Sequence, residues 1–162
     1  MKPEKAIAGK YVLIVDDEQD ILDTLVELLD MCSLDTASSF SEAKELLEGN
    51  DYDIAVLDIM GVDGYGLLKI ANSRNIPAVM LTAHALSSDN LKRSAEEGAA
   101  YYAPKDKMDE IASFLADVFE AMDEGKSPWL KLIDRLSGFY SKTFRGTDWR
   151  EQLEEYVRRS SW

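Results

Sequence analysis

Residues with reactive side chains follow several short apolar runs of this 162-residue chain. They are carboxylates, a hydroxyl and an amine, namely Asp16, Asp17, Asp58, Thr82 and Lys105. If the three carboxylates converged, each would raise the pKa of its neighbours unless a cation joined them. Mg²⁺ prefers one or two carboxylates plus phosphate oxygens, so it fits such a crevice. With the metal bound, Asp58 could act as a nucleophile toward a phosphoryl donor, while Lys105 and Thr82 contact phosphoryl oxygens.

These residues need a scaffold that brings the ends of several strands together. We interpret five short apolar runs as strands, over residues 11–15, 34–37, 54–57, 78–81 and 100–103. Helical spacing predicts helices over 21–32, around 43–47, and over 64–73, 86–97 and 111–122. Five strands that alternate with five helices predict a doubly wound α/β fold, with a parallel sheet covered on both faces. Ligands of such sheets bind beyond the carboxyl ends of the strands, where the reactive residues stand.

Local patterns refine the expected helices. Ser39-Phe40-Ser41-Glu42 matches a capping box and predicts a helix start. Cys32 is expected on the apolar face of the first helix, as part of an inert core. The helix over 86–97 has a thin apolar face, which predicts a loosely held element. The last helix is expected to bury one face, made of Ile111, Leu115, Val118, Phe119 and Met122.

The ordered motifs resemble the receiver domain of two-component response regulators, the CheY-like family. The motifs are Val-Asp16-Asp17-Glu18, Leu-Asp58, Leu-Thr82-Ala83 and Lys105, and the resemblance covers about residues 10–123. It implies a flavodoxin-like sheet of strand order 2-1-3-4-5. It also implies a switch controlled by phosphorylation, which accepts a phosphoryl group from a sensor histidine kinase or a phosphotransfer protein and signals through contacts with another protein.

The resemblance implies roles for the residues around the phosphoryl group. Asp58 would be the phosphoacceptor, and Lys105 and Thr82 would assist it. The small Ala83 side chain would leave the phosphoryl site open. Tyr102 matches the aromatic residue that changes rotamer when Thr82 moves toward the phosphoryl group. A simpler interpretation of Tyr102 is an aromatic side chain packed on the edge strand.

The resemblance also implies a Mg²⁺ site. Asp17 and Asp58 would bind the metal directly, Asp16 would hold it through water, and the backbone carbonyl of Met60 would be a further ligand. A simpler interpretation is that Asp16 and Asp17 begin a helix, where acidic side chains favour the macrodipole. That interpretation leaves Asp58 and its partners unexplained.

Two departures from the family pattern concern the backbone around the site. The stretch 58–64 is shorter than the usual loop by about two residues and lacks its proline. Both differences bear on where the backbone carbonyl of Met60 lies relative to the metal site. The family usually has proline after the lysine, often with a cis bond, whereas here Pro104 precedes Lys105 and Asp106 follows it. A cis bond without proline costs roughly 3 kcal/mol, so Lys105 is expected to approach the site by a different backbone path.

Composition excludes several classes of function. Residues 1–123 carry 10 basic and 25 acidic side chains, a net charge of −15, which disfavours binding to nucleic acid. The longest uncharged run, 75–88, has 14 residues and is too short for a membrane helix. A single cysteine and an N-terminus without the pattern of a secretory signal favour a cytoplasmic protein.

A change in composition near residues 122–128 predicts three parts: an N-terminal tail over 1–9, the receiver domain over 10–123 and a C-terminal extension over 124–162. The extension has a net charge of +2 and two stripes with helical spacing. The stripes are Trp129, Ile133, Leu136 and Tyr140, then Trp149, Leu153, Tyr156 and Val157. Two short amphipathic helices cannot bury their stripes alone, so they pack on the receiver, on a second copy in a homodimer, or on a target protein.

Three alternatives to the phosphorylated switch stay open. One is a receiver-like scaffold that binds partners without being phosphorylated, although the acceptor, metal and lysine positions are all present. Another is a metal-dependent phosphohydrolase with Asp58 as nucleophile, which would need a second general acid that Ile59 and Met60 do not supply. A flavin-binding relative of flavodoxin is disfavoured, because acidic residues stand where a phosphate-binding loop should be.

Overall fold

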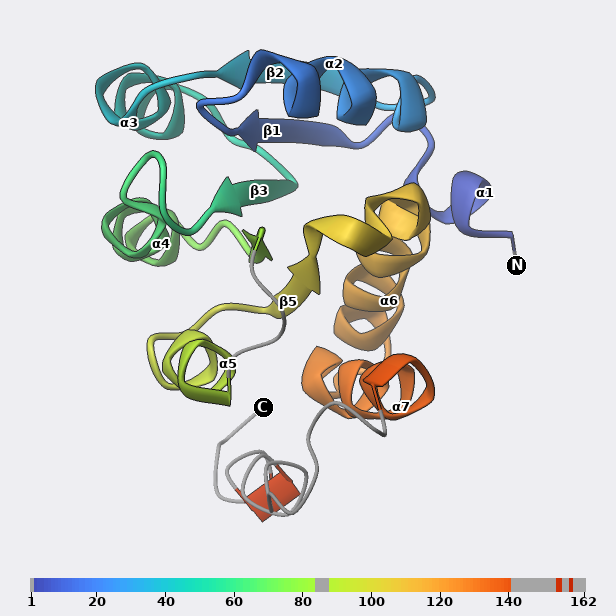
Figure 1. Ribbon diagram of the computed structural model, residues 1–162. Helices are drawn as coiled ribbons and strands as arrows, with labels where there is room; N and C mark the ends of the chain where they lie inside the picture. Colours follow the sequence, from blue (N-terminus) through green and yellow to red (C-terminus); the bar gives the residue numbers. More distant parts are fainter. Residues whose placement is uncertain (1, 84–87, 141–153, 156–157, 159–162) are drawn as a thin grey trace.

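The computed structural model describes residues 2–83, 88–140, 154–155 and 158. Its centre is a five-stranded parallel sheet (Figure 1). The strands are β1 (Tyr11–Val15), β2 (Ser33–Ala37), β3 (Ile54–Asp58), β4 (Ala78–Thr82) and β5 (Tyr101–Pro104), in the order β2-β1-β3-β4-β5. The predicted doubly wound fold and its strand order are therefore confirmed.

Helices precede, connect and follow the strands, and they cover both faces of the sheet. They are α1 (Pro3–Ile7), α2 (Gln19–Leu28), α3 (Phe40–Gly49), α4 (Gly64–Ser73), α5 (Ser88–Glu96), α6 (Ile111–Asp123) and α7 (Pro128–Tyr140), with the 3₁₀ helix η1 (Lys105–Glu110) before α6. α2 packs against α6, and α3 packs against α4. Right-handed crossovers place these two groups on opposite faces. No helix in the described residues is long and apolar enough to cross a membrane.

Of the three central strands, β3 and β4 are buried along their whole length, and β1 is buried from its second residue onward. Their side chains are almost all aliphatic, which suits strands covered on both faces, and backbone pairing continues to the residues that end them. The register pairs Val15 with Leu57, and Asp58 with Leu81. Because parallel strands in register end together, the residues after β1, β3, β4 and β5 meet at one edge of the sheet.

The helix boundaries show one confirmed cap and one wrong assignment. The Ser39 side chain accepts a hydrogen bond from the Glu42 amide at the start of α3, as the capping motif predicts. The Glu42 carboxylate accepts from the Ser38 amide and so closes the motif one residue earlier. α2 ends at Leu28, so the placement of Cys32 on that helix was wrong. Cys32 lies in the following turn, where its thiol donates to the Ile7 carbonyl.

Residues 1–9 were expected as a tail, but residues 3–7 form α1, which packs against α6. Ile7 is fully buried there. The sequence offers one signal of this helix, a proline at its first position followed by Glu4.

α6 is buried on more than one side, because α1, α2 and α7 all pack against it. Phe114 and Ala121 are buried in addition to the expected residues. Met122 is 50% exposed, so its placement on the buried face was wrong. Met122 lies in the last turn of α6, where the packed surface ends, and helical spacing does not show where packing along a helix stops.

α7 docks on the same chain, through α6 and β5 (Figure 1). The indole of Trp129 is fully buried, and its Nε1 donates to the Ala99 carbonyl at 2.8 Å. Arg135 donates two hydrogen bonds to Asp117 of α6, at 2.8 and 3.0 Å, and Tyr101 of β5 donates to the same carboxylate. The first of the two predicted C-terminal helices is thus part of the packed molecule.

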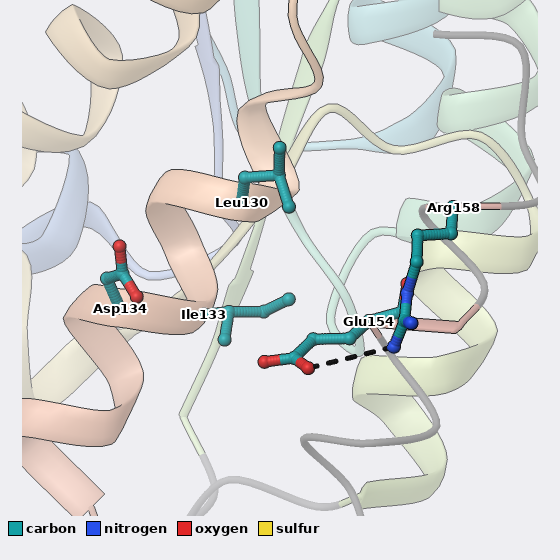
Figure 2. Close-up of a pocket in the computed structure, with 5 residues that line it drawn as sticks. All are labelled: Leu130, Ile133, Asp134, Glu154 and Arg158. Atoms are coloured by element: carbon teal, nitrogen blue, oxygen red, sulfur yellow. Dashed lines mark hydrogen bonds and ion pairs between the residues drawn. The ribbon is translucent and has the colours of Figure 1, made fainter.

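The second apolar stripe, made of Trp149, Leu153, Tyr156 and Val157, lies outside the described residues. The described residues between its members, Glu154 and Glu155, are helical. Figure 2 shows Glu154 and Arg158 facing α7 across a pocket floored by Leu130 and Ile133, with Asp134 at its side. The division of the chain at residues 123–124 stays a prediction.

Candidate functional site

The carboxyl edge of the sheet brings together residues that lie far apart in the sequence. Asp16 follows β1, Asp58 and Thr82 are the last residues of β3 and β4, and Lys105 follows β5. The Asp16 amide donates to the Ala37 carbonyl, so the ladder holds the backbone of the site in place. Asp16, Asp58 and Thr82 expose 0, 3 and 2% of their surface, so these polar groups have been taken out of water at a cost that needs compensation.

Lys105 provides much of that compensation. Its Nζ lies 2.7 Å from Asp16 Oδ2 and 3.1 Å from Asp58 Oδ1. Burial lowers the pKa of this amine, but the hydrogen bonds and charges of the two carboxylates outweigh it, and the net shift is upward. Lys105 is therefore a firmly charged ammonium that bridges the ends of β1 and β3.

The pKa of Asp16 is raised, chiefly because the carboxyl is desolvated by burial. Lys105 and the Glu18 amide, which donates to Asp16 Oδ1 at 2.9 Å, oppose this shift, and the Asp58 charge adds to it. One lysine is thus shared between two buried carboxylates. A second cation at this edge would be favourable, because it would stabilise the ionised form of Asp16.

Asp16, Asp17 and Glu18 form an acidic cluster that could hold a cation, with ligand oxygens within 4.8 Å of one another. Asp17 and Glu18 are exposed and Asp16 is buried, so the cluster opens toward solvent. Oxygen-only ligands with open positions suit Mg²⁺, which keeps several waters. Glu18 belongs to the first motif, but no role was predicted for it. Its carboxylate lies 4.0 Å from Lys105 Nζ, and adjacency in sequence to Asp17 was the available signal.

The connection from β3 to α4 is short and closely folded. The Gly61 amide donates to Asp58 Oδ2 at 2.9 Å, and the Gly64 amide donates to the Ile59 carbonyl at 3.0 Å. Asp63 adopts a left-handed conformation, with φ of 53°, and caps α4 by accepting from the Gly66 amide. The Met60 side chain is 70% exposed at the rim. The role of its carbonyl as a metal ligand stays a prediction.

Lys105 reaches the site on a backbone path that needs no cis bond. All peptide bonds in the described part of the chain are trans, including the one between Lys105 and Asp106. Pro104 ends β5 as the register partner of Thr82, and η1 begins directly afterwards. Proline before the lysine therefore closes the edge strand, where the lack of an amide donor does little harm.

The two expected switch residues occupy neighbouring strands. Tyr102 is fully buried on β5, opposite Met80 of β4, and Thr82 lies two residues further along β4. Ala83 is exposed beside them. The roles of Thr82 and Tyr102 in switching stay predictions, and the segment after Ala83 lies outside the described residues until Ser88.

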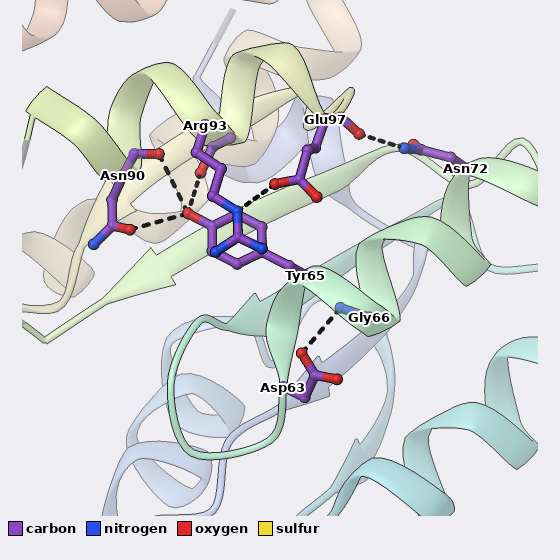
Figure 3. A network of polar contacts seen from close by, with 8 residues as sticks. Asp63, Tyr65, Gly66, Asn72, Asn90, Arg93 and Glu97 are labelled. Atoms are coloured by element: carbon purple, nitrogen blue, oxygen red, sulfur yellow. Dashed lines mark hydrogen bonds and ion pairs between the residues drawn. The ribbon is translucent and has the colours of Figure 1, made fainter.

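α5 is held by more than its thin apolar face. Leu91 and Ala95 are each 2% exposed, so the helix has a small buried stripe. Figure 3 shows a polar network that joins it to α4. The Tyr65 hydroxyl lies 3.2 Å from Asn90 Oδ1, and the Arg93 guanidinium stacks over the Tyr65 ring at 3.8 Å from its centroid. Polar and cation–π contacts thus take the place of a broad hydrophobic face.

The strand order and the residues at the carboxyl edge of the sheet are those that the motifs predict. The family model described as "Response regulator receiver domain" matches residues 12–116. The chain belongs to this family. The match runs from the second residue of β1 into the first half of α6, and it therefore covers all of the site residues.

Individual relatives agree with this assignment. The chain is 39% identical over 98 residues to "Heme response regulator HssR" of Staphylococcus aureus (strain Newman), over 57% of this chain and 43% of that protein. The chain thus spans less than half the length of that relative. Among solved structures, the Francisella response regulator 1452 receiver domain has a TM-score of 0.63 at 27% identity, over 70% of this chain and 99% of that one. The HemR receiver domain of Leptospira biflexa has a TM-score of 0.60 at 31% identity, over 68% of this chain and 94% of that one.

Proposed function

We propose that the chain is a response regulator that is phosphorylated on Asp58. The observation that carries this proposal is the placement of the Asp58 carboxylate, which is almost buried, 3.1 Å from the Lys105 ammonium and beside the acidic cluster at one edge of the sheet. When a phosphoryl group is transferred to a carboxylate, positive groups nearby must neutralise the negative charge of the phosphoryl oxygens. Lys105 supplies a fixed positive charge for this purpose.

The proposed donor is a phosphorylated histidine of a sensor kinase or a phosphotransfer protein. One Asp58 oxygen attacks the phosphorus, and the bond between phosphorus and the imidazole nitrogen breaks. The imidazole leaves with the electron pair and takes up a proton, while Asp58 becomes an acyl phosphate. Lys105 then exchanges its contact with the Asp58 carboxylate for one with a phosphoryl oxygen, and the Thr82 hydroxyl donates to another.

Mg²⁺ is the proposed cofactor, and it supplies neutralisation of the phosphoryl charge when bound. Asp16, Asp17 and Asp58 would hold it, with the Met60 carbonyl as a further ligand. The raised pKa of Asp16 and the solvent-facing oxygens of the cluster support this donor set. The chain's own contribution is to keep these oxygens close and hydrogen-bonded before the ion arrives.

The proposed output passes through contacts with another protein. Thr82 and Tyr102 would transmit the state of Asp58 across β4 and β5, and β5 also carries Tyr101, which contacts the Asp117 and Arg135 pair under α7. The partner could also be a second copy of this chain, in a homodimer formed through the C-terminal helices. Binding to nucleic acid or to a membrane is not proposed.

The proposal is tested by intact mass measurement after incubation with acetyl phosphate and Mg²⁺. We expect the wild-type chain to gain one phosphoryl group and Asp58→Asn to gain none. Asp53→Asn is the matched control, because Asp53 precedes the same strand at its opposite end. No gain in the wild type would favour a scaffold that is never phosphorylated, and rapid repeated consumption of the donor would favour a phosphohydrolase.

A further inference from the structure

Gly61 lies between two carboxylates of the site. Its amide donates to Asp58 Oδ2 at 2.9 Å. The Asp17 carboxylate lies against its α-carbon so closely that a β-carbon at position 61 would fall 2.1 Å from Asp17 Oδ1 and 2.3 Å from Asp17 Cγ. Asp17 comes from the end of β1 and Asp58 from the end of β3. Gly61 therefore contacts both side chains and limits where the Asp17 carboxylate can lie relative to the Asp58 carboxylate.

The short loop around Gly61 has little freedom to move away. Ile59 and Val62 are each 3% exposed and anchor it in the core on either side. A β-carbon on Gly64 would lie 2.2 Å from the Asp58 carbonyl oxygen, so the chain folds back closely on its own strand end. The Asp17 side chain, by contrast, is exposed and can rotate. A side chain at position 61 would therefore displace the Asp17 carboxylate.

We propose that Gly61 is a positioning residue for the cation site, because its lack of a side chain lets the Asp17 carboxylate stand beside Asp58. The inference rests on the proposed function, since the cation is the Mg²⁺ of that proposal. This role explains why a glycine stands at position 61 in the short connection between β3 and α4. Gly61 does not bind the ion, and it acts through Asp17.

Gly61→Ala isolates this effect. The backbone of Gly61 lies outside the left-handed region, so alanine can adopt it, and the amide that donates to Asp58 is retained. Gly49→Ala is the matched control: Gly49 ends α3, also lies outside the left-handed region, and has open space where its β-carbon would be. Both variants add one methyl group, and only the first meets a carboxylate.

The experiment is a calorimetric titration of the full chain with Mg²⁺ alone, for the wild type, Gly49→Ala, Gly61→Ala, Asp17→Asn and the double variant Asp17→Asn/Gly61→Ala. We expect Gly49→Ala to match the wild type and Gly61→Ala to bind about tenfold more weakly, the size expected when the support of a ligand is lost. In the Asp17→Asn background, Gly61→Ala should cause no further loss, because both changes remove the same contribution.

Equal Mg²⁺ affinity of Gly61→Ala and the wild type would overturn the inference, as would a full further loss in the Asp17→Asn background. If Gly61→Ala lowers the melting temperature, adding Asp17→Ala should restore it by removing the clash, and failure to restore it would also overturn the inference. A wild-type chain that binds no Mg²⁺ contradicts the proposed function itself, so the two failures are distinguishable.

Discussion

Single residues at the edge of the sheet are arranged around Lys105. Its side chain is 9% exposed and contacts two carboxylates at the ends of different strands, so it balances their buried charge in the metal-free fold. Removal of one partner from a buried ionic group is costly, since the remaining charges stay buried without compensation. Under the proposed function, the same side chain would serve both the stability of the fold and the phosphoryl group.

Lys105→Met should lower the free energy of unfolding of the metal-free chain by about 3 kcal/mol at neutral pH, since Asp16 and Asp58 then repel each other in a buried position. Mg²⁺ should recover part of this loss, because lysine is not among the proposed ligands and the ion neutralises the same carboxylates. Urea unfolding with and without Mg²⁺ measures both effects. Lys44→Met, on the exposed face of α3, is the control. Unfolding curves that are identical for Lys105→Met and the wild type would disprove this role.

The pKa of Cys32 is raised from 9.0 to about 11, first by burial and then by the charge of Asp30. Because the thiolate is the reactive form, we expect its alkylation rate to rise about tenfold per pH unit beyond pH 9 and to level off only near pH 11. The unfolded chain ionises first, so stability should fall as pH rises through this interval. Alkylation by iodoacetamide over pH 7 to 11 provides the measurement. A rate that levels off near pH 9 would show that the thiol is not buried as described.

The sequence predicted the polar residues of the site well, because each one directly follows an apolar strand and strand ends meet in a parallel sheet. It did not predict which groups touch. The bridge from Lys105 to both Asp16 and Asp58, and the contact between Asp17 and Gly61, depend on rotamers and on the path of a loop with no standard length. The αL conformation of Asp63 is similarly invisible in the spacing of apolar residues.

At the scale of elements, the strands and most helices follow from the alternation of apolar runs and helix-period segments. The helix predicted over 64–73, for example, has the same limits as α4. The errors occur where helices meet one another. Met122 was misplaced because the packed surface of α6 ends before its last two residues, and α1 was missed because five residues give too little periodicity. Burial depends on what packs against an element, which local pattern does not report.

Trp129 attaches α7 to the start of β5, and Trp129→Phe tests that attachment. The variant keeps an aromatic ring but leaves the Ala99 carbonyl without its buried donor, so we expect a loss of about 1–3 kcal/mol in unfolding free energy. Urea unfolding followed by circular dichroism gives this value. Leu130→Ala is the control, since Leu130 is 46% exposed, and it should change stability by about 0.5 kcal/mol or less. Equal effects of the two variants would argue against an anchoring role for Trp129.

At the scale of the whole molecule, the acidic receiver and α7 share one hydrophobic core. Trp129, Leu132 and Ile133 belong to the same buried cluster as the sheet. The Asp117 and Arg135 pair adds a part-buried ionic contact across the boundary that composition predicted. A charge boundary in the sequence thus does not coincide with a gap in packing.

Truncation after Asp123 should leave a folded but less stable chain. It removes three core side chains and leaves Asp117 without its guanidinium partner, so apolar surface becomes exposed and the urea midpoint falls. Truncation after Tyr140, which keeps α7, is the matched control. Binding of a hydrophobic dye and the urea midpoint measure the change, and Asp58 should still be phosphorylated in both. A midpoint equal to that of the control would show that α7 contributes nothing to the core.

The central claim is that Asp58 itself carries the phosphoryl group. Acyl phosphates are reduced by borohydride to the alcohol, so an aspartyl phosphate becomes homoserine and its position can be read by peptide mass mapping. After incubation with acetyl phosphate and Mg²⁺, we predict homoserine at position 58, and none there when Mg²⁺ is omitted and chelated. Homoserine at another acidic residue, or at none while the chain still gains phosphate, would contradict the account.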